Sequence, residues 1–217
     1  MLANTTPDST TNAVIDVSHW NNIRDFAAIK AGGIYGIIHK ATQGLNYVDP
    51  TYIKRRTQAL AAGLAWGAYH FGTGDDANEQ ADHFLETVQP DPKTVIALDL
   101  ERNSIGPSMN RAMAETFIAH VQAKIGRWPV LYTGRWYLRE IMSDSQPTTL
   151  TNCPLWIASY QPMPDLPAQW KTWTFWQYTD GTNGSEPHET PSVGLCDRDK
   201  FNGSPSDLVQ FWGMASF

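Results

Sequence analysis

The sequence predicts one α/β domain in which strands alternate with helices and then give way to strands alone. A length of 217 residues suits a single domain, and 41% hydrophobic with 18% charged residues excludes a disordered chain. Apolar strand-length stretches alternate five times with helical stretches, and three further strands follow. Eight strands with helices outside a parallel sheet favour a TIM-like (β/α)5(β)3 barrel with an irregular last third.

The chain begins with a polar segment, residues 1–12, that is rich in Thr, Ser and Asn. We expect this segment to be a flexible tail and residues 13–217 to form the domain. The first strand is expected at Ala13–Ser18, which is apolar and β-branched. A helix over Ile23–Ala31 should end at Gly32-Gly33, since glycine is typical of helix C-terminal caps.

Four further strand–helix units follow. The strand Thr94–Leu100 is apolar on both faces, as is typical of a buried parallel strand, and several of the helices start at residues that favour N-terminal caps. The expected pairs are Tyr35–Ala41 with a helix from Asp49-Pro50 to Ala62, Leu64–Phe71 with a helix capped by Asp75 or Asp76 and reaching Val88, Thr94–Leu100 with a long helix capped by Ser108, and Val130–Thr133 with a short helix over Arg135–Ser143.

The last third of the chain changes pattern. Strands are expected at Pro154–Tyr160, Thr172–Tyr178 and Leu195–Phe201, with no helical period between them. Loops rich in Pro, Gly and Asn join these strands.

Charge and cysteine content exclude several classes of protein. The 16 Lys and Arg against 22 Asp and Glu give a net charge of −6, which argues against nucleic acid and anionic lipid as partners. No apolar run is long enough for membrane insertion. Cys153 and Cys196 match no metal spacing, so we expect two buried thiols, or alternatively one disulfide. The six histidines are scattered, and we expect neither a metal nor a cofactor.

Carboxylates gather where strands of a βα barrel carry their reactive groups. The fourth strand ends in Asp99-Leu100-Glu101, and alternation places both acids on one face. Like charge makes such a pair hold one proton more tightly, as a general acid requires. They could also be solvated loop carboxylates. Asp16 near the end of the first strand and Asp197 on the last would bring further acids to the same mouth.

Aromatic residues are unusually frequent, with 25 Trp, Tyr and Phe in total. Several lie at the same strand ends as the acids, where rings can stack on sugars, although each ring taken alone is more often part of a core. On alternation, only one of Trp176 and Gln177 can face the mouth. The candidate substrate-binding residues beside the acids are Tyr69, Phe71, Tyr132, Tyr160 and Gln177.

Several short motifs resemble glycoside hydrolase family 25, a family of lysozymes that cleave the β-1,4 bond after N-acetylmuramic acid in peptidoglycan. The resemblance runs in order from residue 14 to about 204. Its motifs are Asp16-Val17-Ser18, His39-Lys40-Ala41-Thr42-Gln43-Gly44, Asp49-Pro50, Gly67-Ala68-Tyr69-His70-Phe71, Asp99-Leu100-Glu101, Pro129-Val130-Leu131-Tyr132-Thr133, Leu155-Trp156-Ile157-Ala158-Ser159-Tyr160, Phe175-Trp176-Gln177-Tyr178 and Asp197 with Phe201-Asn202-Gly203.

The resemblance implies a flattened barrel of eight strands and five helices, and roles for the acids. Glu101 would be the general acid, and Asp99 would orient the substrate's 2-acetamido group or act as a base. Asp16 and Asp197 would complete the acidic floor. The resemblance also places Lys40, Tyr69, Tyr132 and Tyr160 along the sugar subsites.

Two positions depart from the family pattern. Gln43 stands where Glu is usual, and Asn21 stands where Gln is usual. Both bear on which substrate side groups are preferred. Neither changes the four acids, so the expected activity is unaffected.

The expected function is therefore hydrolysis of bacterial cell-wall peptidoglycan by a monomer, without a metal or cofactor. One alternative is hydrolysis of another amino-sugar polymer, such as chitin. Another is a glycan-binding barrel without activity, which would release no reducing ends. The N-terminus has no signal-peptide pattern, so a periplasmic or extracellular site of action would need phage release, a secretion system or a signal missing from this sequence.

Overall fold

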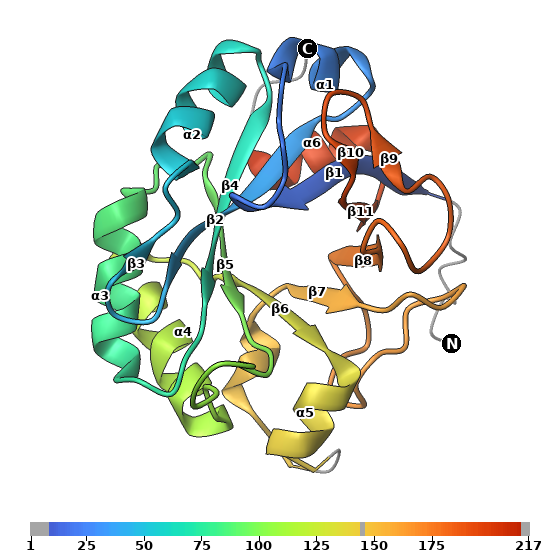
Figure 1. The fold of residues 1–217 in the computed structure, drawn as a ribbon. Helices are drawn as coiled ribbons and strands as arrows, with labels where there is room; N and C mark the ends of the chain where they lie inside the picture. Colours follow the sequence, from blue (N-terminus) through green and yellow to red (C-terminus); the bar gives the residue numbers. More distant parts are fainter. Residues whose placement is uncertain (1–8, 144–145, 214–217) are drawn as a thin grey trace.

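A closed barrel forms the centre of the protein, whose computed structural model describes residues 9–143 and 146–213 (Figure 1). Around the ring the strands follow the order β1-β11-β8-β7-β6-β5-β4-β2, and β1 pairs with β2 to close it. The strands are β1 (Thr10–Val17), β2 (Gly36–Gln43), β4 (Ala65–Phe71), β5 (Val95–Asp99), β6 (Val130–Gly134), β7 (Leu155–Ala158), β8 (Phe175–Thr179) and β11 (Asp197–Asn202). This arrangement confirms the predicted α/β barrel.

Strand direction around the ring is parallel except at β11, which runs antiparallel to both β1 and β8. A parallel connection needs a crossover, usually a helix. The chain between β8 and β11 instead forms the small hairpin of β9 (Glu189–Thr190) and β10 (Gly194–Leu195), so β11 returns in the opposite direction. A further short strand, β3 (Tyr47–Val48), extends the sheet beyond β2.

The helices that connect the parallel strands lie outside the ring (Figure 1). They are α1 (Phe26–Ala31), α2 (Tyr52–Ala61), α3 (Ala77–Val88), α4 (Arg111–Ile125) and α5 (Arg135–Ile141), followed by the 3-10 turn η1 (Thr149–Asn152). No helix among the described residues is long and apolar enough to span a membrane. Cys153 and Cys196 are both free and buried, as predicted.

Three predicted helix starts are wrong because polar side chains bond elsewhere. Asp25 caps α1, so this helix starts after Ile23. Helix α2 begins later than predicted, at Tyr52 with Thr51 as its N-cap residue, and Asp49 accepts from the amide and hydroxyl of Thr51 just before the helix. Ser108 accepts from the amide of Asn103, which leaves Asn110 to cap α4.

The first strand is longer than predicted. Thr10, Thr11 and Asn12, expected in the tail, pair with residues 200–202 of β11. Backbone pairing at the closing seam thus orders residues whose composition is polar. Residues 1–8 of the expected tail lie outside the described residues.

Side-chain alternation divides the core into two layers. On β1, Ile15 and Val17 face the outer helices, whereas Val14 faces the barrel interior and Asp16 the pocket above it. The interior is therefore apolar in its lower part and acidic at its C-terminal mouth. That division fixes where polar chemistry can take place.

Helix α6 (Pro205–Trp212) was not predicted, although Ser204 and Asp207 form a capping box and Pro205 occupies a favourable first position. It closes the lower end of the barrel, and Figure 1 shows it behind β1. Trp212 is 1% exposed and its indole N–H donates to the carbonyl of Trp66 at 2.9 Å. A Cβ on Gly36 would lie 2.7 Å from the Trp212 ring, so the fit is close.

We predict that Trp212→Ala lowers the free energy of unfolding by about 3–5 kcal/mol, because it empties the lower end of the barrel. Denaturant unfolding measures this loss. Trp136→Ala is the matched control, since Trp136 is 80% exposed, and it should change stability by less than about 0.5 kcal/mol. Equal effects of the two substitutions would contradict the role assigned to α6.

Candidate active site

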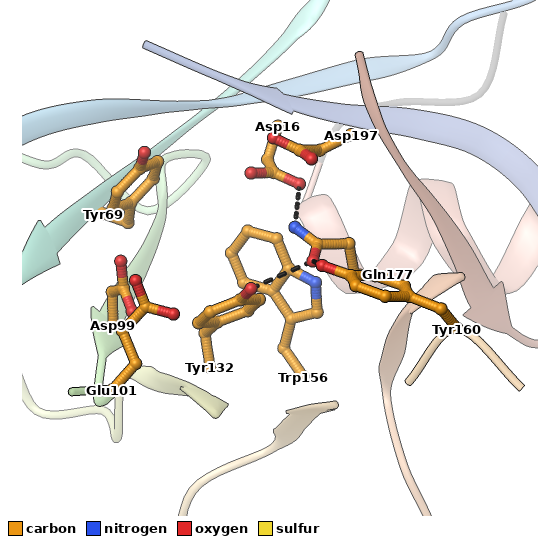
Figure 2. A pocket seen from close by; sticks show the side chains of 9 residues that line it. All are labelled: Asp16, Tyr69, Asp99, Glu101, Tyr132, Trp156, Tyr160, Gln177 and Asp197. Atoms are coloured by element: carbon orange, nitrogen blue, oxygen red, sulfur yellow. Dashed lines mark hydrogen bonds between the residues drawn. The ribbon is translucent and has the colours of Figure 1, made fainter. Parts of the chain in front are cut away.

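A pocket of about 150 Å³ opens at the C-terminal mouth of the barrel. Six parallel strands contribute side chains from within the strand or just beyond its C-terminal end, and antiparallel β11 contributes its first residue. The lining residues are Asp16, Tyr69, Asp99, Glu101, Tyr132, Trp156, Tyr160, Gln177 and Asp197 (Figure 2). The sequence-predicted acids therefore meet in one pocket.

Asp99 and Glu101 stand together on one side of this pocket (Figure 2). Leu100, between them, is fully buried in the outer core, which directs both acids inward. Asp99 is only 6% exposed, whereas Glu101 is partly exposed. The buried Oδ1 of Asp99 has no hydrogen-bond partner among the described residues, which leaves an acceptor for a donor from a ligand.

The ionisation of this pair is displaced toward the protonated form. Burial raises the pKa of Asp99 well above its usual value, and the charge of Glu101 raises it further. Burial also raises the pKa of Glu101. The ammonium of Lys40 opposes both shifts by favouring the ionised carboxylates. The pair can hold a proton at pH values where exposed carboxyls have lost theirs.

Asp16 and Asp197 lie across the pocket from this pair, on adjacent strands whose register places them opposite each other (Figure 2). Burial raises the pKa of Asp16 well above its usual value, and the charges of Asp197 and Asp199 add to the effect. Burial, followed by Asp180 and Glu101, raises the pKa of Asp197 to about 7. This side of the pocket is also poised to hold protons.

Asp199 supports the pocket from below. It is fully buried, and its Oδ1 accepts the indole N–H of Trp156 at 2.7 Å. Burial raises the pKa of Asp199 well above its usual value. Asp199 thus fixes the wall formed by Trp156 without lining the pocket itself.

Gln177 connects the two sides of the pocket through hydrogen bonds. Its Oε1 accepts from the hydroxyls of Tyr132 and Tyr160, each at 2.9 Å, and its Nε2 donates to Asp16 Oδ2 at 2.9 Å (Figure 2). These bonds fix the orientation of its amide. Trp176 faces the outer core instead, in agreement with the alternation that lets only one of the two residues face the mouth.

Three of the five remaining predicted binding residues line the pocket, and two do not. Tyr69, Tyr132 and Tyr160 line it, but Lys40 and Phe71 do not. Lys40 lies over the Phe71 ring, 4.8 Å from its centroid, and lines a neighbouring groove. The sequence did not identify Trp156 as part of the wall, because its strand is apolar on both faces and alternation alone cannot tell its sides apart.

The histidines at strand ends are not close to the acids. His39 and His70 are buried between the barrel and the outer helices, where burial lowers the pKa of His39 to about 4 and that of His70 to about 3. Within residues 9–143 and 146–213, no group of three or more His, Cys, Asp and Glu could hold a metal ion. The pocket's donors are carboxylates, phenols and an amide.

Comparison with known proteins identifies the family. Residues 15–186 match glycosyl hydrolases family 25. The chain is 32% identical over 211 residues to lysozyme M1 of Streptomyces globisporus, covering 90% of this chain and 69% of that protein. It is 30% identical over 209 residues to an N,O-diacetylmuramidase of Arthroderma benhamiae, covering 90% and 84% of the two chains.

Solved structures agree with this assignment. A bacterial lysozyme from Streptomyces coelicolor superposes with a TM-score of 0.81 at 29% identity, covering 98% of this chain and all of that one. A family 25 lysozyme from Aspergillus fumigatus superposes with a TM-score of 0.80 at 28% identity, covering 95% of this chain and 100% of that one. With an acidic pocket at the mouth of the same barrel, this chain belongs to glycosyl hydrolase family 25 and is a glycoside hydrolase.

Proposed function

We propose that this enzyme is an N-acetylmuramidase, which cleaves the β-1,4 bond between N-acetylmuramic acid and N-acetylglucosamine in peptidoglycan. The observation that carries the proposal is the Asp99–Glu101 pair, which faces Asp16 and Asp197 in one aromatic-walled pocket. Relatives named lysozyme and N,O-diacetylmuramidase support the choice of substrate. We further propose action on the bacterial cell wall by a single chain, since one barrel carries all four acids.

Glu101 is the proposed general acid. It is the more exposed member of the pair and has the longer side chain, so it can reach the glycosidic oxygen of a polymer that enters from solvent. Burial raises its pKa, which keeps it protonated at higher pH. Asp99 is more deeply buried and has the shorter side chain, so it is less able to reach that oxygen, and Lys40 favours the ionised forms of both carboxyls.

Asp99 is the proposed partner of the substrate's acetamido group. Its Oδ1 lacks a protein partner among the described residues and can accept the acetamido N–H. An acetamido group held in this way can attack the anomeric carbon itself, as in substrate-assisted glycosidases.

The proposed reaction has two steps, formation and hydrolysis of an oxazolinium ion. Glu101 gives its proton to the glycosidic oxygen as the bond from this oxygen to C1 breaks, and the acetamido oxygen bonds to C1 from the opposite face. The oxazolinium ion that results keeps its N–H against the Asp99 carboxylate. Water then attacks C1 and gives a proton back to Glu101, while the bond from C1 to the acetamido oxygen breaks. Two inversions retain the configuration at C1.

We predict that Glu101→Gln reduces turnover of purified peptidoglycan by roughly 10²–10⁴-fold or more while glycan binding persists, because an amide cannot supply the proton. Reducing-end release with mass spectrometry of the products measures the effect. Wild-type products should end in reducing N-acetylmuramic acid.

The matched control is Glu86→Gln, an exposed glutamate on α3 that should keep wild-type activity. Near-native turnover by Glu101→Gln would refute the assignment of the acid. Wild-type products that end in N-acetylglucosamine would change the bond cleaved, and a wild type that binds walls without releasing reducing ends would favour a binding protein.

The Asp197 carboxyl should destabilise the folded protein at pH values where it is ionised. Its pKa is about 7 in the folded protein against 3.8 ordinarily, so the folded state binds the proton more tightly. The stabilisation that the Asp197 proton gives to the folded state is therefore fully present below pH ~4 and is lost as the pH rises to about 7. At pH 8, Asp197→Asn should raise the free energy of unfolding by at least about 1 kcal/mol, which corresponds to a rise of roughly 2–4 °C in the melting temperature. At pH 3.5 the substitution should change the melting temperature little. Calorimetry at both pH values measures this, and an equal change at the two would contradict the assigned ionisation.

A further inference from the structure

A second hollow, which we call the rim groove, adjoins the catalytic pocket and has a volume of about 500 Å³. Two of its hydrophobic side chains are almost fully in solvent, with Trp20 85% and Ile105 92% exposed. The lining residues are His19, Trp20, Lys40, Gln43, Gly44, Leu45, Tyr47, Thr73, Asp75 and Ile105.

The rim groove and the pocket share structural elements. Lys40 on β2 stands in register with Tyr69 on β4, which lines the pocket. Ile105 belongs to the loop that leaves Glu101, so this loop carries the proposed acid at one end and a groove residue at the other. A polymer unit bound at Asp99 and Glu101 therefore has the rim groove beside it.

The outer wall of the rim groove is held in place from behind. Asp49, whose side chain is fully buried, accepts the amide N–H of His19 at 2.9 Å, and its Oδ2 lies 2.9 Å from His19 Nδ1. The same ring nitrogen lies 3.1 Å from the hydroxyl of Tyr47. The His19 ring also contacts Trp20, with centroids 4.5 Å apart. These contacts position Trp20 and Tyr47 before any ligand arrives.

The rim groove is lined by the ammonium of Lys40 and by the carboxylate of Asp75, and the ammonium is the group that a ligand carboxylate would contact. Lys40 donates to the Oε1 of Gln43 at 2.6 Å. No carboxylate forms an ion pair with Lys40 among the described residues, and the charges of Asp99, Asp49 and Glu101 act on it from farther away. The ammonium lies 5.7 Å from the centre of the Tyr47 ring and 4.8 Å from that of Phe71. Lys40 lines the rim groove and does not line the pocket, so a ligand carboxylate would reach it from the rim groove.

We propose that the rim groove binds the short peptide carried by N-acetylmuramic acid, with a peptide carboxylate against Lys40 and its small aliphatic side chains against Trp20 and Ile105. An uncharged sugar would use the Trp20 ring but neither the cation nor the aliphatic surface of exposed Ile105 and half-buried Leu45. The peptide uses all of these features. This inference rests on the proposed muramidase function and specifies the substrate as peptide-bearing glycan.

The experiment compares kcat/KM on two soluble substrates: peptidoglycan glycan strands that keep their peptides, and the same strands freed of peptides by an amidase. The wild type should prefer the peptide-bearing strands. Trp20→Ala and Ile105→Ser should each lower this preference ratio roughly fivefold or more, because truncating a binding anchor typically has an effect of this size. Trp136→Ala, which removes an equally exposed tryptophan outside the rim groove, should keep the wild-type ratio.

The outcomes separate the two proposals. Equal rates of the wild type on both substrates would overturn the peptide site and leave the muramidase function intact. A parallel loss on both substrates in Trp20→Ala would overturn it too, because it would make the rim groove a sugar subsite. A wild type that cleaves neither substrate would overturn the muramidase function, and the peptide site with it.

Discussion

Burial of carboxylates at one end of a closed barrel is the constraint on which the rest of the structure depends. Asp16, Asp99 and Asp199 are each nearly or fully removed from solvent. An ionised carboxylate in such a place is costly, so these groups take up protons, share hydrogen bonds or remain poised for a ligand. The apolar lower barrel and its closing helix α6 provide the rigid support that holds these acids together despite their mutual repulsion.

The antiparallel strand β11 is what completes the site. In a fully parallel barrel the first residue of the last strand would lie at the bottom, far from the mouth. Because β11 runs in reverse, Asp197 at its start lies beside Asp16, and Asp199 reaches Trp156 from below. The irregular last third of the chain is thus the part that adds acids to the side facing Asp99 and Glu101.

Two kinds of polar support surround these acids. Gln177 joins the walls directly, through two tyrosine hydroxyls and Asp16, and so keeps the pocket's shape fixed. Lys40 acts by its charge, which favours the ionised forms of Asp99 and Glu101. Because Lys40 also lines the rim groove, the same cation links the ionisation of the proposed catalytic pair to whatever anion binds there.

The sequence by itself determined the barrel, the placement of Asp99 and Glu101 on one face of their strand, and the constraint that only one of Trp176 and Gln177 faces the mouth, because each follows from local periodicity and alternation. Only the tertiary structure decided the reversal of β11, the position of Trp156 in the wall, and the exclusion of Lys40 and Phe71 from the pocket lining. The start of helix α6 could have been predicted from the capping residue Ser204, but its position beneath the barrel could not. Strand direction and shared cavities depend on contacts between residues far apart in the chain, and local patterns carry no information about those contacts.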